Sequence, residues 1–108
     1  MASSKEYLIY ILDQLSELEG ITYRPMMGEY IIYYNGKIAA YLCDDRLLVK
    51  PVPSAVRLLP DAKYEPPYPG AKDMILIEAV DDRAFLTRLF SSMLDELPEP
   101  KKKKKKNE

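Results

Sequence analysis

The stretch EYIIYYNGKIAAYLCDDRLLVK, residues 29–50, decides the fold. Its isoleucines, valines and tyrosines favour strands, and Asn35-Gly36 is a strong signal for a two-residue hairpin turn. A second tight turn is predicted at Asp44-Asp45. Residues 29–50 therefore predict three antiparallel strands that belong to one sheet.

The two turns also predict which side chains share a face. The first turn places Tyr34 opposite Lys37 and Tyr30 opposite Tyr41, and the second places Tyr41 opposite Leu48. The predicted core face carries Ile31, Tyr33, Ile38, Ala40, Leu42, Leu47 and Val49. The predicted second face carries Tyr30, Ile32, Tyr34, Lys37, Ala39, Tyr41, Cys43, Arg46, Leu48 and Lys50.

Helices are predicted on both sides of this stretch. Apolar residues recur at helical spacing over about residues 4–18, with Ser3 as the expected N-cap and Gly20 at the C-terminal end. Residues 53–59 can form a short helix. The proline-rich residues 60–72 predict an extended loop, since proline stiffens a chain and ends regular structure.

The remaining segments are a strand and a helix. Met74 to Val80 predicts the strand, and Asp81 or Asp82 is the expected cap of a final amphipathic helix that ends before Pro98. The order helix, strands, short helix, strand, helix predicts an α+β fold in two layers. An antiparallel sheet is expected, with the helices packed mainly on one of its faces.

A chain of 108 residues has room for one domain. We expect this domain over residues 1–98 and a disordered lysine-rich tail over residues 99–108. Residues 1–100 carry ten basic and sixteen acidic side chains, a net charge of −6. Nucleic-acid-binding domains are usually basic, so attraction to polyanions is expected from the tail or from a local patch. Its lysines are Lys101, Lys102, Lys103, Lys104, Lys105 and Lys106.

Residues suited to catalysis are scarce. The chain has no histidine and one cysteine, Cys43, and it lacks the glycine-rich loops that hold phosphates. The pairs Asp44-Asp45 and Asp81-Asp82 are more typical of a turn and a helix cap than of a carboxylate site. We therefore expect no catalytic residues, no metal site and no cofactor, and an enzyme that uses carboxylates alone is the weakest hypothesis.

Nine tyrosines, and no tryptophan, suggest a surface that meets a partner. The predicted partner-binding residues, on the second face of the sheet, are Tyr30, Ile32, Tyr34, Tyr41, Arg46 and Leu48. Because an apolar patch seldom faces water unless something binds there, we expect a protein partner or self-association at this patch. The competing interpretations are that a helix, the proline loop or a second subunit covers these rings, or that bases stack on them.

Three segments resemble the N-terminal domain of the TfoX (Sxy) family. They are Arg24-Pro25-Met26-Met27-Gly28-Glu29-Tyr30, Tyr34-Asn35-Gly36-Lys37-Ile38-Ala39 and Asp45-Arg46-Leu47-Leu48-Val49-Lys50. The motif residues are Arg24, Met27, Gly28, Gly36 and Lys50, with Met27 in the place of a usual aromatic residue. We also expect the backbone to bend or bulge at Gly28.

The resemblance implies a two-layer α/β domain and a regulatory role, since the family's namesakes regulate natural competence as co-activators beside a DNA-bound transcription factor. Those regulators carry a second, helical domain that is not seen in this chain. We therefore predict a non-enzymatic interaction or regulatory accessory domain. The alternative is a protein that binds nucleic acid weakly and without sequence preference through its lysine tail.

The expected location is the cytoplasm. The apolar runs are too short to cross a bilayer, and the first residues lack the pattern of a secretory signal. A single cysteine cannot form a disulfide within the chain, as expected for a reducing compartment.

Overall fold

The computed structural model describes residues 4–98, so the predicted Ser3 cap and the lysine tail lie outside the described residues. The elements are α1 (Lys5–Gln14), β1 (Ile21–Met26), β2 (Glu29–Tyr34), β3 (Lys37–Cys43), β4 (Arg46–Val49), α2 (Pro53–Leu58), β5 (Tyr64–Glu65), β6 (Met74–Ile77), α3 (Arg83–Met93) and the 3₁₀ helix η1 (Leu94–Glu96). The strands form one open sheet in the order β1-β2-β3-β4-β6-β5, and every neighbouring pair is antiparallel. The predicted α+β fold is confirmed.

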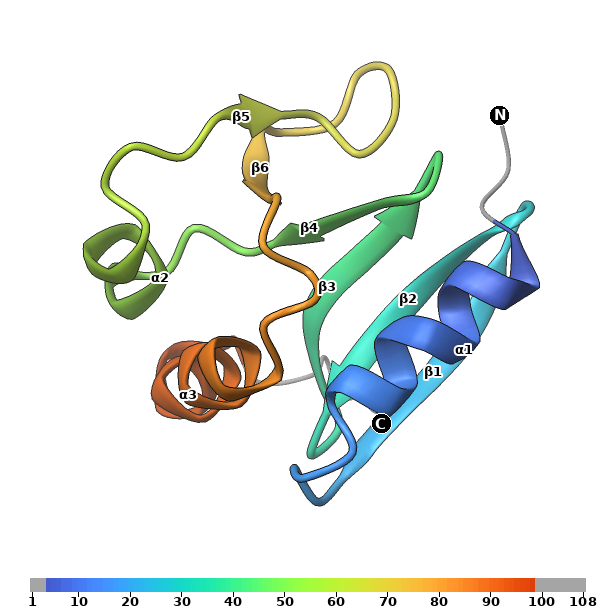
Figure 1. Ribbon diagram of the computed structural model, residues 1–108. Coiled ribbons are helices and arrows are strands. Elements are labelled where there is room, and N and C mark those ends of the chain that lie inside the picture. Colours follow the sequence, from blue (N-terminus) through green and yellow to red (C-terminus); the bar gives the residue numbers. More distant parts are fainter. Residues whose placement is uncertain (1–3, 99–108) are drawn as a thin grey trace, which may run out of the picture.

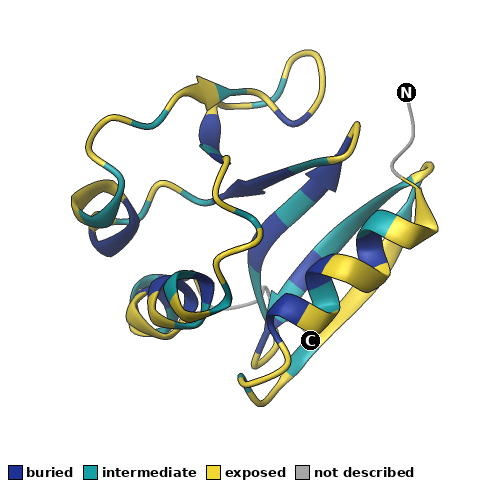
Figure 2. Ribbon diagram, in the orientation of Figure 1, coloured by how far each residue is buried: buried dark blue, intermediate teal, exposed yellow. Residues whose placement is uncertain are grey.

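The helices α1 and α3 lie on the same side of the sheet, and α2 packs against α3 (Figure 1). Buried residues gather where the helices meet the strands (Figure 2). The main core takes Leu8 and Ile11 from α1 and Leu89 and Phe90 from α3. Among residues 4–98, no helix is both long enough and apolar enough to cross a membrane.

Tight turns join the first four strands. In each of Met27-Gly28, Asn35-Gly36 and Asp44-Asp45, both residues have positive φ, as in type I′ turns, whose twist matches that of the flanking strands. The turns at Asn35-Gly36 and Asp44-Asp45 were predicted. Of the two alternatives predicted for Gly28, the bend is confirmed, since Gly28 completes a hairpin turn; the hairpin of β1 and β2 itself was not foreseen.

The predicted register of β2 and β3 is correct only next to the turn. Tyr34 lies opposite Lys37 and Tyr33 opposite Ile38, but Ile32 then lies opposite Ala40 instead of Ala39. Ala39 is thus the extra residue of a β-bulge on β3. The predicted register of β3 and β4, with Tyr41 opposite Leu48, is confirmed.

The bulge changes the face to which each side chain of β2 belongs. Because cross-strand partners share a face, Ile32 lies with Ala40 in the main core, under the helices. Tyr34 is buried in the same core and Tyr30 packs against it. Ile31 lies with Tyr41 on the opposite face. The prediction that Tyr30, Ile32 and Tyr34 share a face with Tyr41 is therefore wrong.

The predicted ends of α1 need correction. The hydroxyl of Ser4 accepts the N–H of Tyr7 at 3.0 Å, so Ser4 is the N-cap. The helix ends at Gln14 rather than near residue 18, and Gly20, with φ of 87°, forms part of the link to β1. In α3 the predicted cap is confirmed, since the carboxylate of Asp82 accepts the N–H of Phe85 at 3.0 Å.

Glu96 of η1 caps the N-terminal end of α2. Ser54 donates two hydrogen bonds to its carboxylate, from the N–H to Oε1 and from the hydroxyl to Oε2, each at 2.8 Å. These bonds hold the pKa of Glu96 below its ordinary value, with a smaller contribution from Arg57. The carboxylate satisfies an N–H that the helix itself leaves without a partner.

We expect Glu96→Gln to lower the free energy of unfolding near neutral pH. The contribution of a carboxylate with a depressed pKa is present above its unfolded-state pKa and is lost as the pH falls through its folded-state pKa. The difference between wild type and variant should therefore shrink below about pH 4.5, close to the ordinary pKa of glutamate. Urea unfolding of both proteins at about pH 7 and about pH 3 measures this, and a constant difference would contradict it.

Candidate functional site

The face of the sheet turned away from α1 and α3 is called the far face here. On β2 it carries Ile31 and Tyr33, and on β3 it carries Ile38 and Tyr41. All four side chains are half-buried, although no helix within residues 4–98 covers them. Arg24 of β1 lies opposite Ile31 and shares this face. The far face of β1–β3 is thus an apolar, tyrosine-containing surface within reach of solvent.

The far face of β4 and β6 is closed by the proline loop, residues 66–72. Pro67 is buried there, and the ring of Tyr68 lies 6.5 Å from the ring of Tyr41, inclined by 58°. Beneath the loop Leu48 is fully buried in a second apolar cluster with Cys43 and Met74. Of the interpretations left open by the sequence, cover by the proline loop therefore holds for this half of the face.

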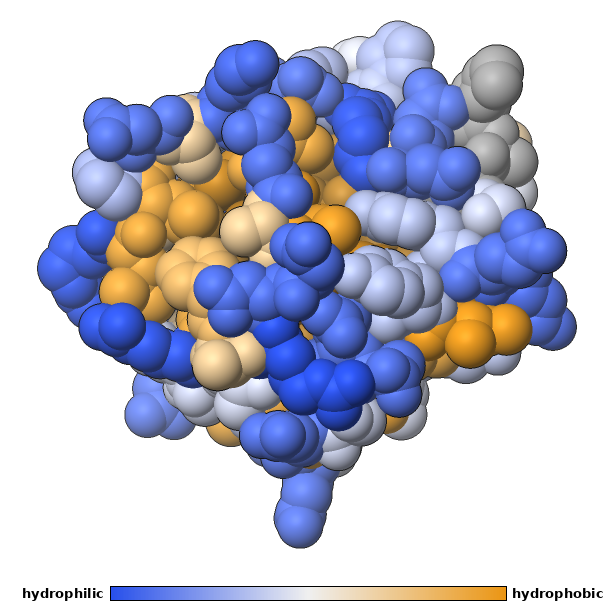
Figure 3. All heavy atoms as spheres, in the orientation of Figure 1, coloured by the Kyte–Doolittle hydropathy of each residue, from blue (hydrophilic) through white to orange (hydrophobic). Residues whose placement is uncertain are grey.

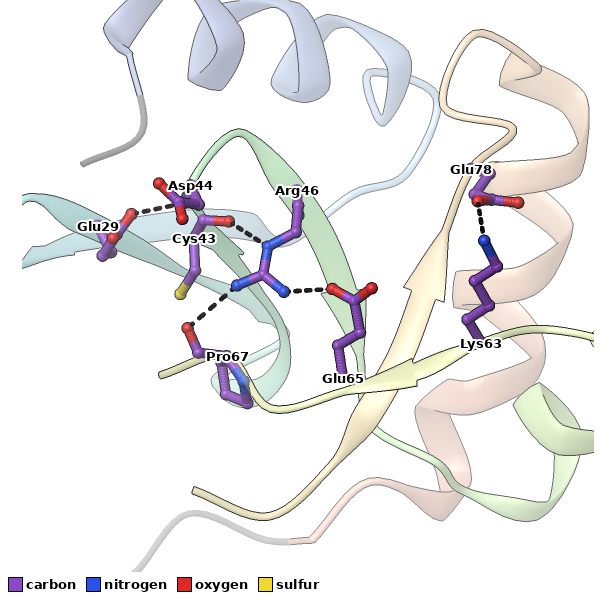
Figure 4. A network of polar contacts seen from close by, with 8 residues as sticks. All are labelled: Glu29, Cys43, Asp44, Arg46, Lys63, Glu65, Pro67 and Glu78. Atoms are coloured by element: carbon purple, nitrogen blue, oxygen red, sulfur yellow. Dashed lines mark hydrogen bonds and ion pairs between the residues drawn. The ribbon is translucent and has the colours of Figure 1, made fainter. Parts of the chain in front are cut away.

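Arg46 ties the loop to the sheet (Figure 4). Its Nε donates to the carbonyl of Cys43 at 3.1 Å, one terminal nitrogen pairs with Glu65, and the other reaches the carbonyl of Pro67 at 3.5 Å. These contacts connect β4 with β5 and with the start of the loop. Arg46 therefore holds the cover over Leu48 in place.

Cys43 lies in the second cluster as a protonated thiol. Burial, with a smaller effect of Glu29, raises its pKa to about 11. A thiol with this pKa is almost entirely protonated at neutral pH, and the thiolate is the nucleophilic form. The sulfur therefore behaves as a small apolar group, as the sequence predicted.

A hollow of about 230 Å³ lies where the open and closed halves of the far face meet. Its lining includes the rings of Tyr41 and Tyr68 and the side chains of Lys50 and Lys72. Burial, followed by the neighbouring Tyr68, raises the pKa of Tyr41, so its hydroxyl keeps its proton and can donate a hydrogen bond. The hollow thus offers aromatic walls, two lysines and the acidic Asp73 beside the open far face.

The structure divides the six predicted partner-binding residues between two faces. Tyr30, Ile32 and Tyr34 lie under the helices, and Tyr41, Arg46 and Leu48 lie on the far face. Ile32 and Leu48 have no exposed surface and are unavailable to a partner in the folded domain. Sequence reasoning placed Ile31 and Tyr33 on the core face and so missed them as surface residues, because it did not foresee the bulge.

The motif residues fall into two groups. Arg24 lies on the far face and Lys50 lines the hollow beside it. Met27, Gly28 and Gly36 lie in the turns that begin and end β2, where their positive φ angles set the direction of the hairpins. The motif thus combines two cations on one surface with the turns that shape it.

Another apolar surface lies on the helix side. Figure 3 shows hydrophobic side chains gathered over α2, α3 and β6. Leu58, Leu59, Val80 and Phe85 are only partly buried against the main core in this part of the chain, and Val56 of α2 is 41% exposed. This surface is the structural rival of the far face.

Carboxylates do not gather into a metal site in the described part of the chain. Within residues 4–98, no group of three or more Cys, Asp or Glu side chains is arranged to hold an ion. The pair Asp44-Asp45 serves a turn, and the N–H of Asp44 donates to Glu29 at 3.1 Å. Asp82 serves the cap of α3.

Comparison with known proteins identifies a family and a relative of this chain. A family model described as the TfoX N-terminal domain matches residues 13–94. The chain is 31% identical over 107 residues to an "uncharacterized 12.7 kDa protein in trpE 5′ region" of Spirochaeta aurantia, and the match covers 98% of this chain and 93% of that protein. No solved structure matches the chain.

Proposed function

The chain belongs to the TfoX N-terminal domain family, and from this premise we propose that it is a non-enzymatic accessory domain that binds a protein partner through the far face of its sheet. The observation that carries the proposal is the half-buried surface of Ile31, Tyr33, Ile38 and Tyr41. Antiparallel sheets can leave one face to water, but that face is then usually polar. An apolar face without a covering helix is typical of a surface that another molecule covers.

The composition of the far face supports a protein as the partner. Tyrosine and arginine are enriched where proteins meet, because they combine a large contact area with a polar group. Tyr33 and Tyr41 lie on this face together with Arg24. The overall negative charge of residues 1–100 disfavours a polyanion on the same surface.

The motif that carries the family resemblance supports the same surface. Its two cations, Arg24 and Lys50, lie on either side of the tyrosines of the far face. The regulatory role that we propose is that of the family's namesakes, which act beside a DNA-bound transcription factor. In this role the domain would contact a protein of the transcription apparatus and would not read DNA itself.

We predict that Tyr33→Glu reduces recovery of the partner at least about tenfold, because a charge in the centre of an apolar contact leaves it buried and unpaired. The change should cost the isolated domain no more than about 1 kcal/mol, since Tyr33 is only half-buried. Co-purification of tagged wild type and variant from the native cell, with the partner quantified by mass spectrometry, measures this.

Tyr64→Glu is the matched control. Tyr64 is 46% exposed on β5 and pairs with Ile75 of the main core, so its side chain lies on the opposite face. Recovery should be unchanged by this variant. Full recovery with folded Tyr33→Glu, or equal losses with both variants, would exclude the far face as the partner surface.

A further inference from the structure

Met27 is in an unfavourable position for two reasons, its exposure to solvent and its backbone conformation. It is 97% exposed, more than any other large hydrophobic residue described, and its φ is 51°. The first central position of a type I′ turn prefers asparagine, aspartate or glycine, because other residues are strained at positive φ. Within residues 4–98 almost nothing covers the Met27 side chain, so a second molecule packed against it would bury apolar surface.

Met27 stands at the end of an open sheet edge. The sheet begins with β1, most of which is exposed, as Figure 2 shows. Asn35 donates its N–H to the carbonyl of Gly20 at 2.9 Å, which fixes the alternation of hydrogen bonds along the hairpin. By this alternation, the N–H and C=O of Ile21 and Tyr23 and the C=O of Pro25 point away from β2.

The other end of β1 borders an apolar hollow. The hollow has a volume of about 430 Å³ and lies between the C-terminal part of α1, the link that follows it, and β1. Its lining residues are Leu12, Leu15, Ser16, Leu18, Ile21, Thr22 and Tyr23. The chain thus carries an exposed apolar side chain at one end of a free edge and an apolar recess at the other.

We propose that two copies of this chain associate through antiparallel pairing of their β1 edges, with Met27 of each copy seated at the hollow of the other. A two-fold axis beside Tyr23 brings Tyr23 opposite Tyr23 of the second copy and Ile21 opposite Pro25 of the second copy. The same register continues to Met27, which then lies beside Glu19 of the second copy, between Leu18 and Ile21 that line its hollow. The single two-fold rotation thus covers both the exposed Met27 and the apolar hollow at the other end of β1.

Pro25 is compatible with this register. The two Tyr23 residues exchange both backbone hydrogen bonds, and each Ile21 N–H donates to a Pro25 carbonyl. The pairing loses only two hydrogen bonds, those that an N–H at position 25 of each copy would donate to the Ile21 carbonyl of the other. Because the pairing uses both β1 edges, and the remaining edge strand β5 has two residues, the assembly closes as a dimer and does not grow into a fibre.

This inference concerns the β1 edge and does not depend on the far face. The test is sedimentation equilibrium of the full chain up to about 1 mM, a range suited to weak interfaces, with wild type and Met27→Asn. Asparagine suits positive φ, so the variant should melt at a higher temperature than wild type. Its association constant should nevertheless be at least about tenfold lower, because the anchoring side chain is gone.

Two further readouts make the test decisive. Val56→Asn, which removes another exposed apolar side chain on α2, should leave association unchanged. The Tyr23 amide should exchange slowly with deuterium in concentrated wild type and rapidly in Met27→Asn or at low concentration. A chain that stays monomeric throughout, a Met27→Asn variant that dimerises like wild type, or an unprotected Tyr23 amide in the dimer would overturn the proposal.

Discussion

Ile32→Asp is expected to unfold the domain, whereas Ile31→Asp, one residue away, is expected to leave it folded. Ile32 has no exposed surface and packs in the main core, so aspartate there buries a charge without a partner. The cost should exceed about 5 kcal/mol, which is half or more of the roughly 5–10 kcal/mol that stabilises a domain of this size. Ile31 is half-buried on the far face, where a charge stays hydrated at a cost of about 1–2 kcal/mol.

Urea unfolding followed by circular dichroism measures both variants. The comparison tests the bulge at Ala39 directly, because a register without a bulge would place Ile31 in the core and Ile32 on the other face. The reverse order of stabilities would therefore show that the bulge is absent. Equal, severe losses would show that both faces of β2 are interior.

Gly20→Ala is expected to lower the free energy of unfolding by about 2–3 kcal/mol. Two causes act together. The φ of Gly20 is 87°, which strains any residue with a Cβ atom. An added Cβ would also lie 1.9 Å from the side-chain oxygen of Asn35, so the asparagine that starts the β2–β3 turn must move.

Gly36→Ala separates the two causes. Gly36 has a similar φ of 81°, but nothing lies within 4 Å of the position of its Cβ. We expect this control to show the backbone strain alone, about 1 kcal/mol. Thermal unfolding resolves the difference, since 1 kcal/mol shifts the melting temperature by about 4–8 °C in a domain this small. Equal shifts for the two variants would mean that the Asn35 side chain moves aside without lowering the free energy of unfolding.

The elements that sequence reasoning found are those whose signals are local. Asn35-Gly36 predicts its turn because few residues tolerate positive φ, and Asp82 predicts a helix start because its carboxylate reaches the next free N–H. The hairpin of β1 and β2 was missed because its turn lacks such a local signal: Met27 adopts positive φ, and methionine rarely does so. The two-residue strand β5 carries too little pattern to be seen.

The candidate site depended on contacts between distant parts of the chain. Whether Ala39 bulges is decided by packing on both faces of β3, and no short pattern in residues 37–43 encodes it. The fold of the proline loop over Leu48 depends on Arg46 meeting Glu65, 19 residues further along the chain. The sequence therefore predicted that one face of the sheet is apolar and carries tyrosine. Three of the six residues assigned to this face lie on the opposite face, under the helices.

The most direct measurement of the central claim is site-specific photo-cross-linking in the native cell. A benzoylphenylalanine at position 33 replaces Tyr33 on the far face, and one at position 56 replaces Val56 on the rival helix-side surface. Because the same photoreactive side chain stands at both positions, a difference in cross-linking reports which surface the partner covers. We expect a defined adduct with a second protein from position 33 and none from position 56. Adducts from position 56 alone would contradict the assignment of the far face as the partner surface.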